Sequence, residues 1–98
     1  MFSYNIFKQN KDVLLAICDE DILGRTFSDG ELEITISEFY KGKNCDIADA
    51  IKLAKNATII NAVGKNIINI LIEKKFVDAS SVLQIGETSH VQVVSMQY

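Results

Sequence analysis

The stretch Val13-Leu14-Leu15-Ala16-Ile17-Cys18 is a short, continuous apolar run. A strand with apolar side chains at every position is buried on both of its faces, and this run predicts such a strand. In residues 2–8 the side chains of Phe2, Tyr4 and Ile6 recur at a spacing of two, which predicts a second strand. The polar segment 9–12 between the two predicts a turn, so we expect the strands to form a hairpin.

The next segment is predicted to hold one short helical turn and a second hairpin. Residues 19–24 form the turn, with Asp19 in the capping position and Gly24 at the end. Strands are predicted at 25–27 and 32–36, because the Asp29-Gly30 pair between them is a strong hairpin signal. Residues 37–44 are predicted to form a loop.

The helices are predicted in the middle of the chain. Asp46 precedes the first helix, and Asp49 follows three residues later in an acidic variant of the capping box. The apolar stripe expected to be buried consists of Ile47, Ala50, Ile51, Leu53 and Ala54. A second helical stretch is predicted over residues 58–75, and Gly64 either bends it or breaks it into two pieces.

Two more strands, at 82–85 and 91–94, are predicted on either side of a polar loop. The expected order of elements is therefore β-β-β-β-α-α-β-β. This order predicts a single α+β domain over residues 1–98, a mainly antiparallel sheet with two or three helices covering one face.

The composition restricts the class of protein. A chain of 98 residues with 48% hydrophobic content can bury a core of its own, which argues against disorder. The N-terminus has no signal-peptide pattern, and no run approaches the roughly 18 apolar residues of a membrane span, so a soluble, cytoplasmic protein without membrane contact is expected.

The metal-ligating residues are few. Cys18 and Cys45 form no CxxC motif, and the chain has one histidine, so four ligands for a structural zinc are not at hand. We expect no metal and no cofactor. A disulfide between the two cysteines is formally possible, but nothing indicates an oxidising compartment and we expect both thiols to be reduced.

The net charge of −3 is unevenly distributed. Residues 19–38 carry seven acidic side chains against Arg25 alone, whereas residues 41–75 carry seven lysines against three acidic side chains. One interpretation is a basic face on the helical half that meets an acidic partner. The other is an ordinary solvated surface on both halves.

The polar loop near the C-terminus holds the only histidine, and it is the first candidate site. Histidine is the side chain whose usual pKa lies closest to neutrality. A glycine permits close backbone approach, and hydroxyls beside the ring can form a small anion pocket; equally, the loop simply turns the chain. The candidate residues are Gly86, Thr88, Ser89, His90 and Gln92.

A second candidate site lies where the apolar strand ends, at Cys18, Asp19 and Gly24. If Cys18 meets His90 in space, the imidazole can activate the thiol as a nucleophile. The alternative is that Cys18 is a small core residue.

A third candidate site is a surface for RNA or another partner. Phe39-Tyr40 can stack on a base while neighbouring lysines hold phosphate, and Asn61-Ala62-Val63-Gly64-Lys65 weakly resembles the turn of a helix-hairpin-helix. The alternatives are an aromatic anchor for the loop and a glycine that lets two helices pack. The candidate residues are Tyr40, Lys41, Lys43, Lys52, Lys55, Asn61, Gly64 and Lys65.

Several of these segments, in this order, resemble the archaeal family called domain of unknown function 424. The family shows a second glycine and a proline in the last loop, where this chain has Glu87 and Ser89. The resemblance implies a small cytoplasmic archaeal protein of unassigned biochemical function, with an association to translation and ribosome-related genes. The matching residues are Ala16-Ile17-Cys18-Asp19-Glu20 with Leu23-Gly24, Phe39-Tyr40 with Gly42, Ala57-Thr58-Ile59 with Asn61 and Val63-Gly64, and Ile85-Gly86 with His90 and Gln92.

Three functions stay open at this point. The first is a non-catalytic binding module in translation or ribosome-related processes that contacts RNA or a ribonucleoprotein, although an isoelectric point of about 5.0 is unusual for such a module. The second is a protein-interaction adaptor that presents its acidic hairpin to a basic partner. The third is a small enzyme or ligand-binding protein built around His90. Binding to DNA is not expected.

Overall fold

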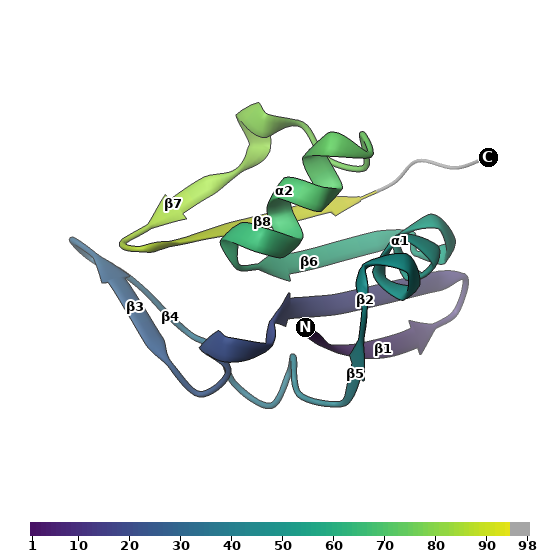
Figure 1. Cartoon of the computed structure of the whole chain (residues 1–98), viewed down its shortest axis with the longest axis horizontal. Coiled ribbons are helices and arrows are strands. Elements are labelled where there is room, and N and C mark those ends of the chain that lie inside the picture. Colours follow the sequence, from purple (N-terminus) through teal and green to yellow (C-terminus); the bar gives the residue numbers. More distant parts are fainter. Residues whose placement is uncertain (95–98) are drawn as a thin grey trace.

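The apolar run of the sequence lies in strand β2 (Asp12–Asp19), in the middle of a six-stranded sheet of order β5-β1-β2-β6-β8-β7 (Figure 1). The structure is a computed structural model, and it describes residues 1–94. Neighbouring strands of this sheet are antiparallel except β2 and β6, which run parallel.

The remaining strands of the large sheet are β1 (Phe2–Gln9), β5 (Lys43–Cys45), β6 (Ile59–Val63), β7 (Leu83–Ile85) and β8 (Thr88–Val94). Strands β3 (Thr26–Asp29) and β4 (Leu32–Thr35) form a separate two-stranded sheet. The helices are α1 (Ile47–Asn56) and α2 (Lys65–Glu73), with short 3₁₀ turns η1 (Glu20–Ile22) and η2 (Ala79–Ser81). No helix in the described part of the chain is long and apolar enough to cross a membrane.

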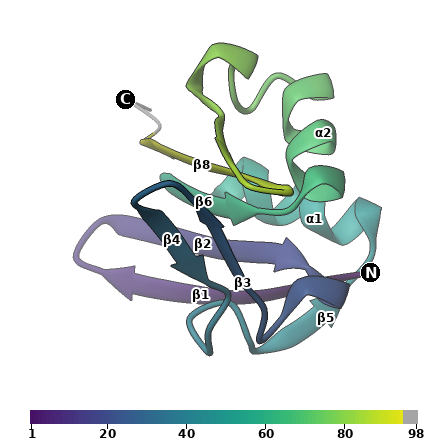
Figure 2. The same ribbon diagram turned by 90° about the vertical axis from the view of Figure 1, so that its left-hand side faces the viewer.

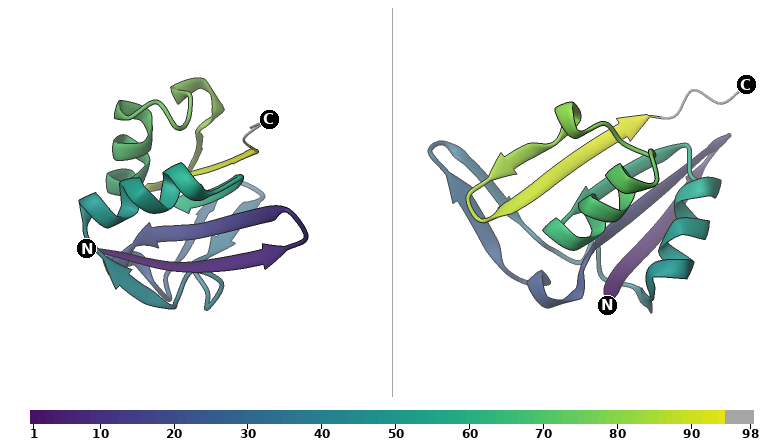
Figure 3. Two further views of the ribbon diagram at one scale, coloured as in Figure 1. Left: turned by 90° about the vertical axis from the view of Figure 1, so that its right-hand side faces the viewer. Right: turned by 45° about the horizontal axis from the view of Figure 1, so that its top comes forward.

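Side chains alternate between the two faces of the sheet, and each face is covered differently. Both α-helices pack on one face, which we call the helix face; the β3–β4 hairpin covers one end of the other, which we call the open face (Figures 2 and 3). The helix face presents Leu15, Ile17, Ile60, Ala62 and Val91 to the helices. The open face carries Ala16, Cys18, Asn61, Val63 and His90.

Several predictions about the fold are confirmed. The chain is α+β with a mainly antiparallel sheet, and the end of β2 is buried on both faces as its apolar run requires. Both predicted hairpins form, with register partners Gln9↔Asp12 and Asp29↔Leu32 at their turns. The capping box is also present, because the backbone N–H of Asp49 donates to Asp46 Oδ1 at 2.9 Å.

The predicted order of elements is wrong in two places. Residues 59–63, predicted to be helical, form strand β6; three of the five are β-branched, and the strand is held between β2 and β8. Gly64 is the boundary, since its φ of +121° ends the strand and it stands at the N-cap position of α2. Within the predicted loop, β5 pairs with the first residues of β1 and is too short to show a pattern of its own.

Two further side chains differ from expectation. Ile47, predicted to be buried, is 46% exposed at the first position of α1. Asp19 makes no side-chain cap to the turn that follows it. Instead it accepts hydrogen bonds from the backbone N–H groups of Asn66 and Ile67, at 3.0 and 2.9 Å, and caps α2 from a distant strand.

Candidate functional site

Four polar side chains meet around Asn61 on the open face, and we call them the Asn61 cluster: Tyr40, Asn61, His90 and Gln92. The hydroxyl of Tyr40 donates to Asn61 Oδ1 at 2.5 Å, and His90 Nε2 lies 3.1 Å from the same oxygen. Asn61 Nδ2 donates to Gln92 Oε1 at 3.4 Å. The strand register explains the meeting, because Asn61 of β6 lies opposite Gln92 of β8.

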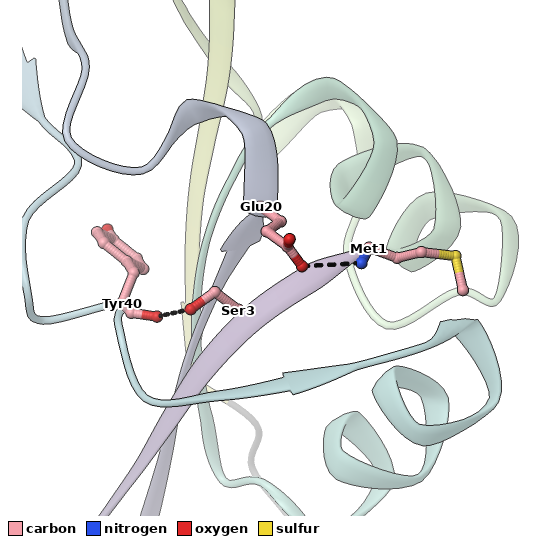
Figure 4. A network of polar contacts seen from close by, with 4 residues as sticks. All are labelled: Met1, Ser3, Glu20 and Tyr40. Atoms are coloured by element: carbon pink, nitrogen blue, oxygen red, sulfur yellow. Dashed lines mark hydrogen bonds and ion pairs between the residues drawn. The ribbon is translucent and has the colours of Figure 1, made fainter.

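Strand β1 holds the loop that brings Tyr40 to the sheet. The hydroxyl of Ser3 donates to the backbone oxygen of Tyr40 at 2.8 Å, as Figure 4 shows. The side-chain amide of Asn5 donates to the backbone oxygens of three loop residues, Glu38, Phe39 and Lys41. With these anchors Tyr40 is only 4% exposed, so the loop is fixed over the sheet.

The cluster is neutral near pH 7. Burial raises the pKa of Tyr40 to about 12, so its hydroxyl stays protonated and remains a donor. Burial lowers the pKa of His90 from its usual 6.5, so the ring is uncharged. Because Asn61 Oδ1 accepts hydrogen bonds and cannot donate them, Nε2 of His90 carries the ring hydrogen. The other nitrogen, Nδ1, then carries the lone pair and is an acceptor.

An aromatic chain connects this cluster to the edge of the sheet. The rings of Phe7 and Phe39 are stacked with centroids 5.2 Å apart, and Phe39 meets Tyr40 edge to face at 5.1 Å. Phe7 is 42% exposed and Phe39 is 37% exposed. Two accessible rings therefore lie next to the buried tyrosine that bonds to Asn61.

Beside the cluster runs a line of four apolar side chains, one from each of four adjacent strands, which we call the apolar row: Phe7, Leu14, Ile59 and Val94. Leu14 and Ile59 are half-buried, and the two ends of the row are exposed. Neither the helices nor the β3–β4 hairpin contributes to the apolar core at this end of the open face. The row and the cluster together form a mixed surface of apolar and hydrogen-bonding groups.

The predicted C-terminal loop is a tight hairpin between β7 and β8, with Gly86 at a φ of +61°. His90 and Gln92 belong to the Asn61 cluster. Ser89 faces the opposite side of the sheet, where its hydroxyl donates to Gln84 Oε1 at 2.9 Å, and Thr88 is buried. Because side chains alternate along β8, Ser89 lies on the opposite face from Thr88 and His90, so the predicted anion pocket does not have both hydroxyls beside the ring.

The predicted contact between the Cys18 thiol and the His90 imidazole is also wrong. Cys18 lies opposite Val63, and Val63 lies opposite His90, so a whole strand separates the two groups. That separation is about 10 Å, or two strand spacings. Burial raises the pKa of Cys18 to about 12, which removes the thiolate needed for nucleophilic attack. Both cysteines are free and buried.

The other residues of the second candidate site have structural roles. Burial outweighs the two amide hydrogen bonds and raises the pKa of the Asp19 carboxyl, which sits against the start of α2. Gly24, at a φ of +83°, donates its N–H to the backbone oxygen of Ile36 at 2.8 Å and closes the base of the β3–β4 hairpin.

The third candidate site is divided by the sheet. Lys52 and Lys55 are exposed on α1, on the helix face, whereas Asn61 and Tyr40 lie on the open face. Lys43 is on edge strand β5, Lys41 on the loop, and Lys65 at the start of α2. The helix-hairpin-helix interpretation is wrong because β6 precedes Gly64.

Gly64 itself packs tightly against Asp19. A Cβ at this glycine would come within 2.5 Å of Asp19 Cγ, so the small residue permits the capping contact. The sequence reasoning also missed the apolar row. Ile59 lies in a segment predicted to be helical, and only the strand register aligns it with Phe7, Leu14 and Val94.

Comparison with known proteins agrees with the resemblance seen in the sequence. No curated protein matches the chain. The crystal structure of an uncharacterised conserved protein from Methanopyrus kandleri is similar, with a TM-score of 0.80 and 26% identity over 99% of this chain and 95% of that one. The profile of the family described as protein of unknown function DUF424 matches residues 7–96. The chain therefore belongs to the DUF424 family.

Proposed function

We propose that this protein is a non-catalytic module that binds single-stranded RNA, within translation or ribosome-related processes, through the open face of its sheet. The observation that carries the proposal is the exposed Phe7–Phe39 stack beside the Asn61 cluster. The translation setting comes from the family resemblance alone. The sheet face supplies the contact chemistry.

The chemistry of the surface suits unpaired bases. Exposed aromatic rings provide platforms on which bases stack, and sequence-specific RNA recognition uses hydrogen bonds to the edges of such bases. Gln92 is exposed and has an amide that both donates and accepts. His90 adds an acceptor at Nδ1 in its neutral form. Stacking and edge recognition are therefore available on the same surface.

The charges predict an unusual salt dependence. Of the five candidate lysines only Lys41 lies on the loop that carries Phe39 and Tyr40, and four lie on β5, α1 or α2. RNA affinity falls with salt in proportion to the number of phosphates contacted. We therefore expect binding led by stacking, with a shallow slope equivalent to about one or two phosphate contacts.

The test is fluorescence anisotropy with labelled RNA oligonucleotides, titrated with the wild type and with the double variant Phe7→Ala, Phe39→Ala. Each base stacked on an aromatic ring is worth about 1–3 kcal/mol, so the double variant should bind at least about tenfold more weakly. Leu32→Ala, which removes a side chain of 49% exposure on the hairpin, is the matched control and should bind as the wild type does. Failure of the wild type to bind saturably would refute the RNA proposal.

The apolar row favours a second candidate function, a protein-interaction adaptor. Exposed aromatic and aliphatic side chains without a lysine, aspartate or glutamate among them are typical of the centre of a protein–protein interface. Crosslinking from a photoreactive residue in place of Val94 separates the two functions. A ribonuclease-sensitive adduct supports RNA, and a ribonuclease-resistant protein adduct supports the adaptor.

A further inference from the structure

A groove of about 620 Å³ opens on the opposite side of the molecule from the Asn61 cluster, where the start of α1 approaches α2 and the first residues of the chain. Its apolar lining includes Phe2 on β1, Ile47 on α1 and Ile70 on α2. Glu20 and Asp21, which follow β2, lie at its rim. Figure 4 shows Glu20 beside the first residue of the chain, at this edge of the sheet.

Ile47 is more exposed in this groove than its position in the apolar stripe of α1 predicts. The helical pattern of the sequence predicts a buried residue, but the side chain is 46% exposed, whereas Ala50 and Ala54 of the same helix are buried. Phe2 forms part of the floor and is only 3% exposed. The isoleucine therefore faces a space that the fold leaves unfilled.

The charged side chains around the groove are acidic, and one positive group, the terminal ammonium of Met1, pairs with Glu20 Oε2 at 3.1 Å. Glu20 and Asp21 are exposed, and Asp46 and Asp49 flank Ile47 in the chain. Among the described residues that line the groove, none is a lysine or arginine. A phosphate backbone is disfavoured beside these carboxylates, whereas a cationic partner is attracted.

We propose that this groove binds a short basic segment of a partner protein. An apolar side chain of the segment contacts Ile47 and Ile70. Its lysine or arginine side chains pair with Asp21 and with Glu20, where they share the carboxylate with the ammonium of Met1. The volume of the groove lies within the range of about 300–1,000 Å³ that is typical of ligand sites, so it accommodates one or two side chains. Asn66, exposed at the start of α2, adds an amide that can bond to the backbone of the segment.

The probes are amidated synthetic peptides about ten residues long, in which lysine alternates with serine around one central leucine, phenylalanine or methionine. Binding is measured by anisotropy, and the contact residues are located by ¹H–¹⁵N NMR shifts. At least one peptide should bind saturably, with shift changes at the residues that line the groove. Replacing lysine by glutamate, or the central residue by serine, should weaken binding at least about fivefold.

Two pairs of variants locate the site. Glu20→Lys with Asp21→Lys should weaken peptide binding at least about tenfold, whereas Glu31→Lys with Glu33→Lys, the same charge change on the hairpin, should alter it less than about twofold. Ile47→Ser should weaken binding while Leu32→Ser should not, and thermal unfolding confirms that each variant folds. Equal losses in both charge pairs, shift changes elsewhere, or no saturable binding at about 1 mM peptide would overturn the proposal.

Discussion

The two faces of the six-stranded sheet come from the same strands and differ in what covers them. The helix face is apolar along its centre and lies under both α-helices. The open face has a core only at the end under the β3–β4 hairpin, and beyond it the Asn61 cluster and the apolar row are partly exposed. A single alternating pattern of side chains thus provides stability on one face and leaves the other available for binding.

The largest expected difference in stability is between replacing Leu15 and replacing Leu14, neighbouring leucines whose side chains point to opposite faces of the sheet. Leu15 is 1% exposed on the helix face, and Leu14 is half-buried in the apolar row. Leu15→Ala should lower the free energy of unfolding by about 2–5 kcal/mol, because it leaves a cavity in a packed core. Leu14→Ala should lower it by about 1 kcal/mol, because its surroundings are partly solvent. Urea denaturation measures both, and equal losses would mean that the open face is as closely packed as the helix face.

The next largest loss of stability should follow from removing Asp19, the buried carboxylate that caps α2 on the helix face. Asp19→Ala leaves two amide groups at the start of α2 without acceptors and should lower the free energy of unfolding by about 1–3 kcal/mol. The neighbouring, exposed Asp21→Ala is the control and should change it by less than about 0.5 kcal/mol. Amide hydrogen exchange should show faster exchange at Asn66 and Ile67 in the first variant alone. Unchanged exchange at these two amides would show that Asp19 does not cap α2.

On the open face, the hydrogen bond between Tyr40 and Asn61 is the corresponding, partly buried polar contact. Tyr40→Phe removes the hydroxyl that bonds to Asn61 and should cost about 0.5–1.5 kcal/mol of stability. Asn61→Leu should cost about 1–3 kcal/mol, because it leaves the buried tyrosine hydroxyl unpaired. A double-mutant cycle should show coupling between the two changes. If the two costs simply add, the hydrogen bond between them does not contribute to folding.

The smallest effect is a pH dependence from His90. Burial places its pKa in the folded chain below the usual 6.5, so between these two values the unfolded chain binds more protons than the folded one. The free energy of unfolding should therefore fall as the pH drops below about 6.5, with a slope of at most about 1.4 kcal/mol per pH unit. In His90→Gln this contribution is absent, so the stability difference between wild type and variant should shrink from pH 7.5 to pH 5. A constant difference would show that His90 titrates as it does in the unfolded chain.

The sequence by itself was sufficient for the features that depend on local periodicity. The apolar run of β2, the two turns of the hairpins and the Asp46–Asp49 cap are each encoded within a few residues, so the pattern of the chain is enough to predict them. His90 and Asn61 were also among the candidate residues, singled out by their polarity and by the family resemblance.

What only the tertiary structure decided is everything that depends on pairing across the chain. Residues 59–63 are a strand because β2 and β8 supply their hydrogen bonds, and neither partner is near in sequence. Asp19 caps a helix that begins 46 residues later, at Lys65. The strand register brings Asn61 to His90 and keeps Cys18 away from it. The physical reason is that local patterns specify which face a side chain takes, whereas register and coverage arise from contacts between distant segments.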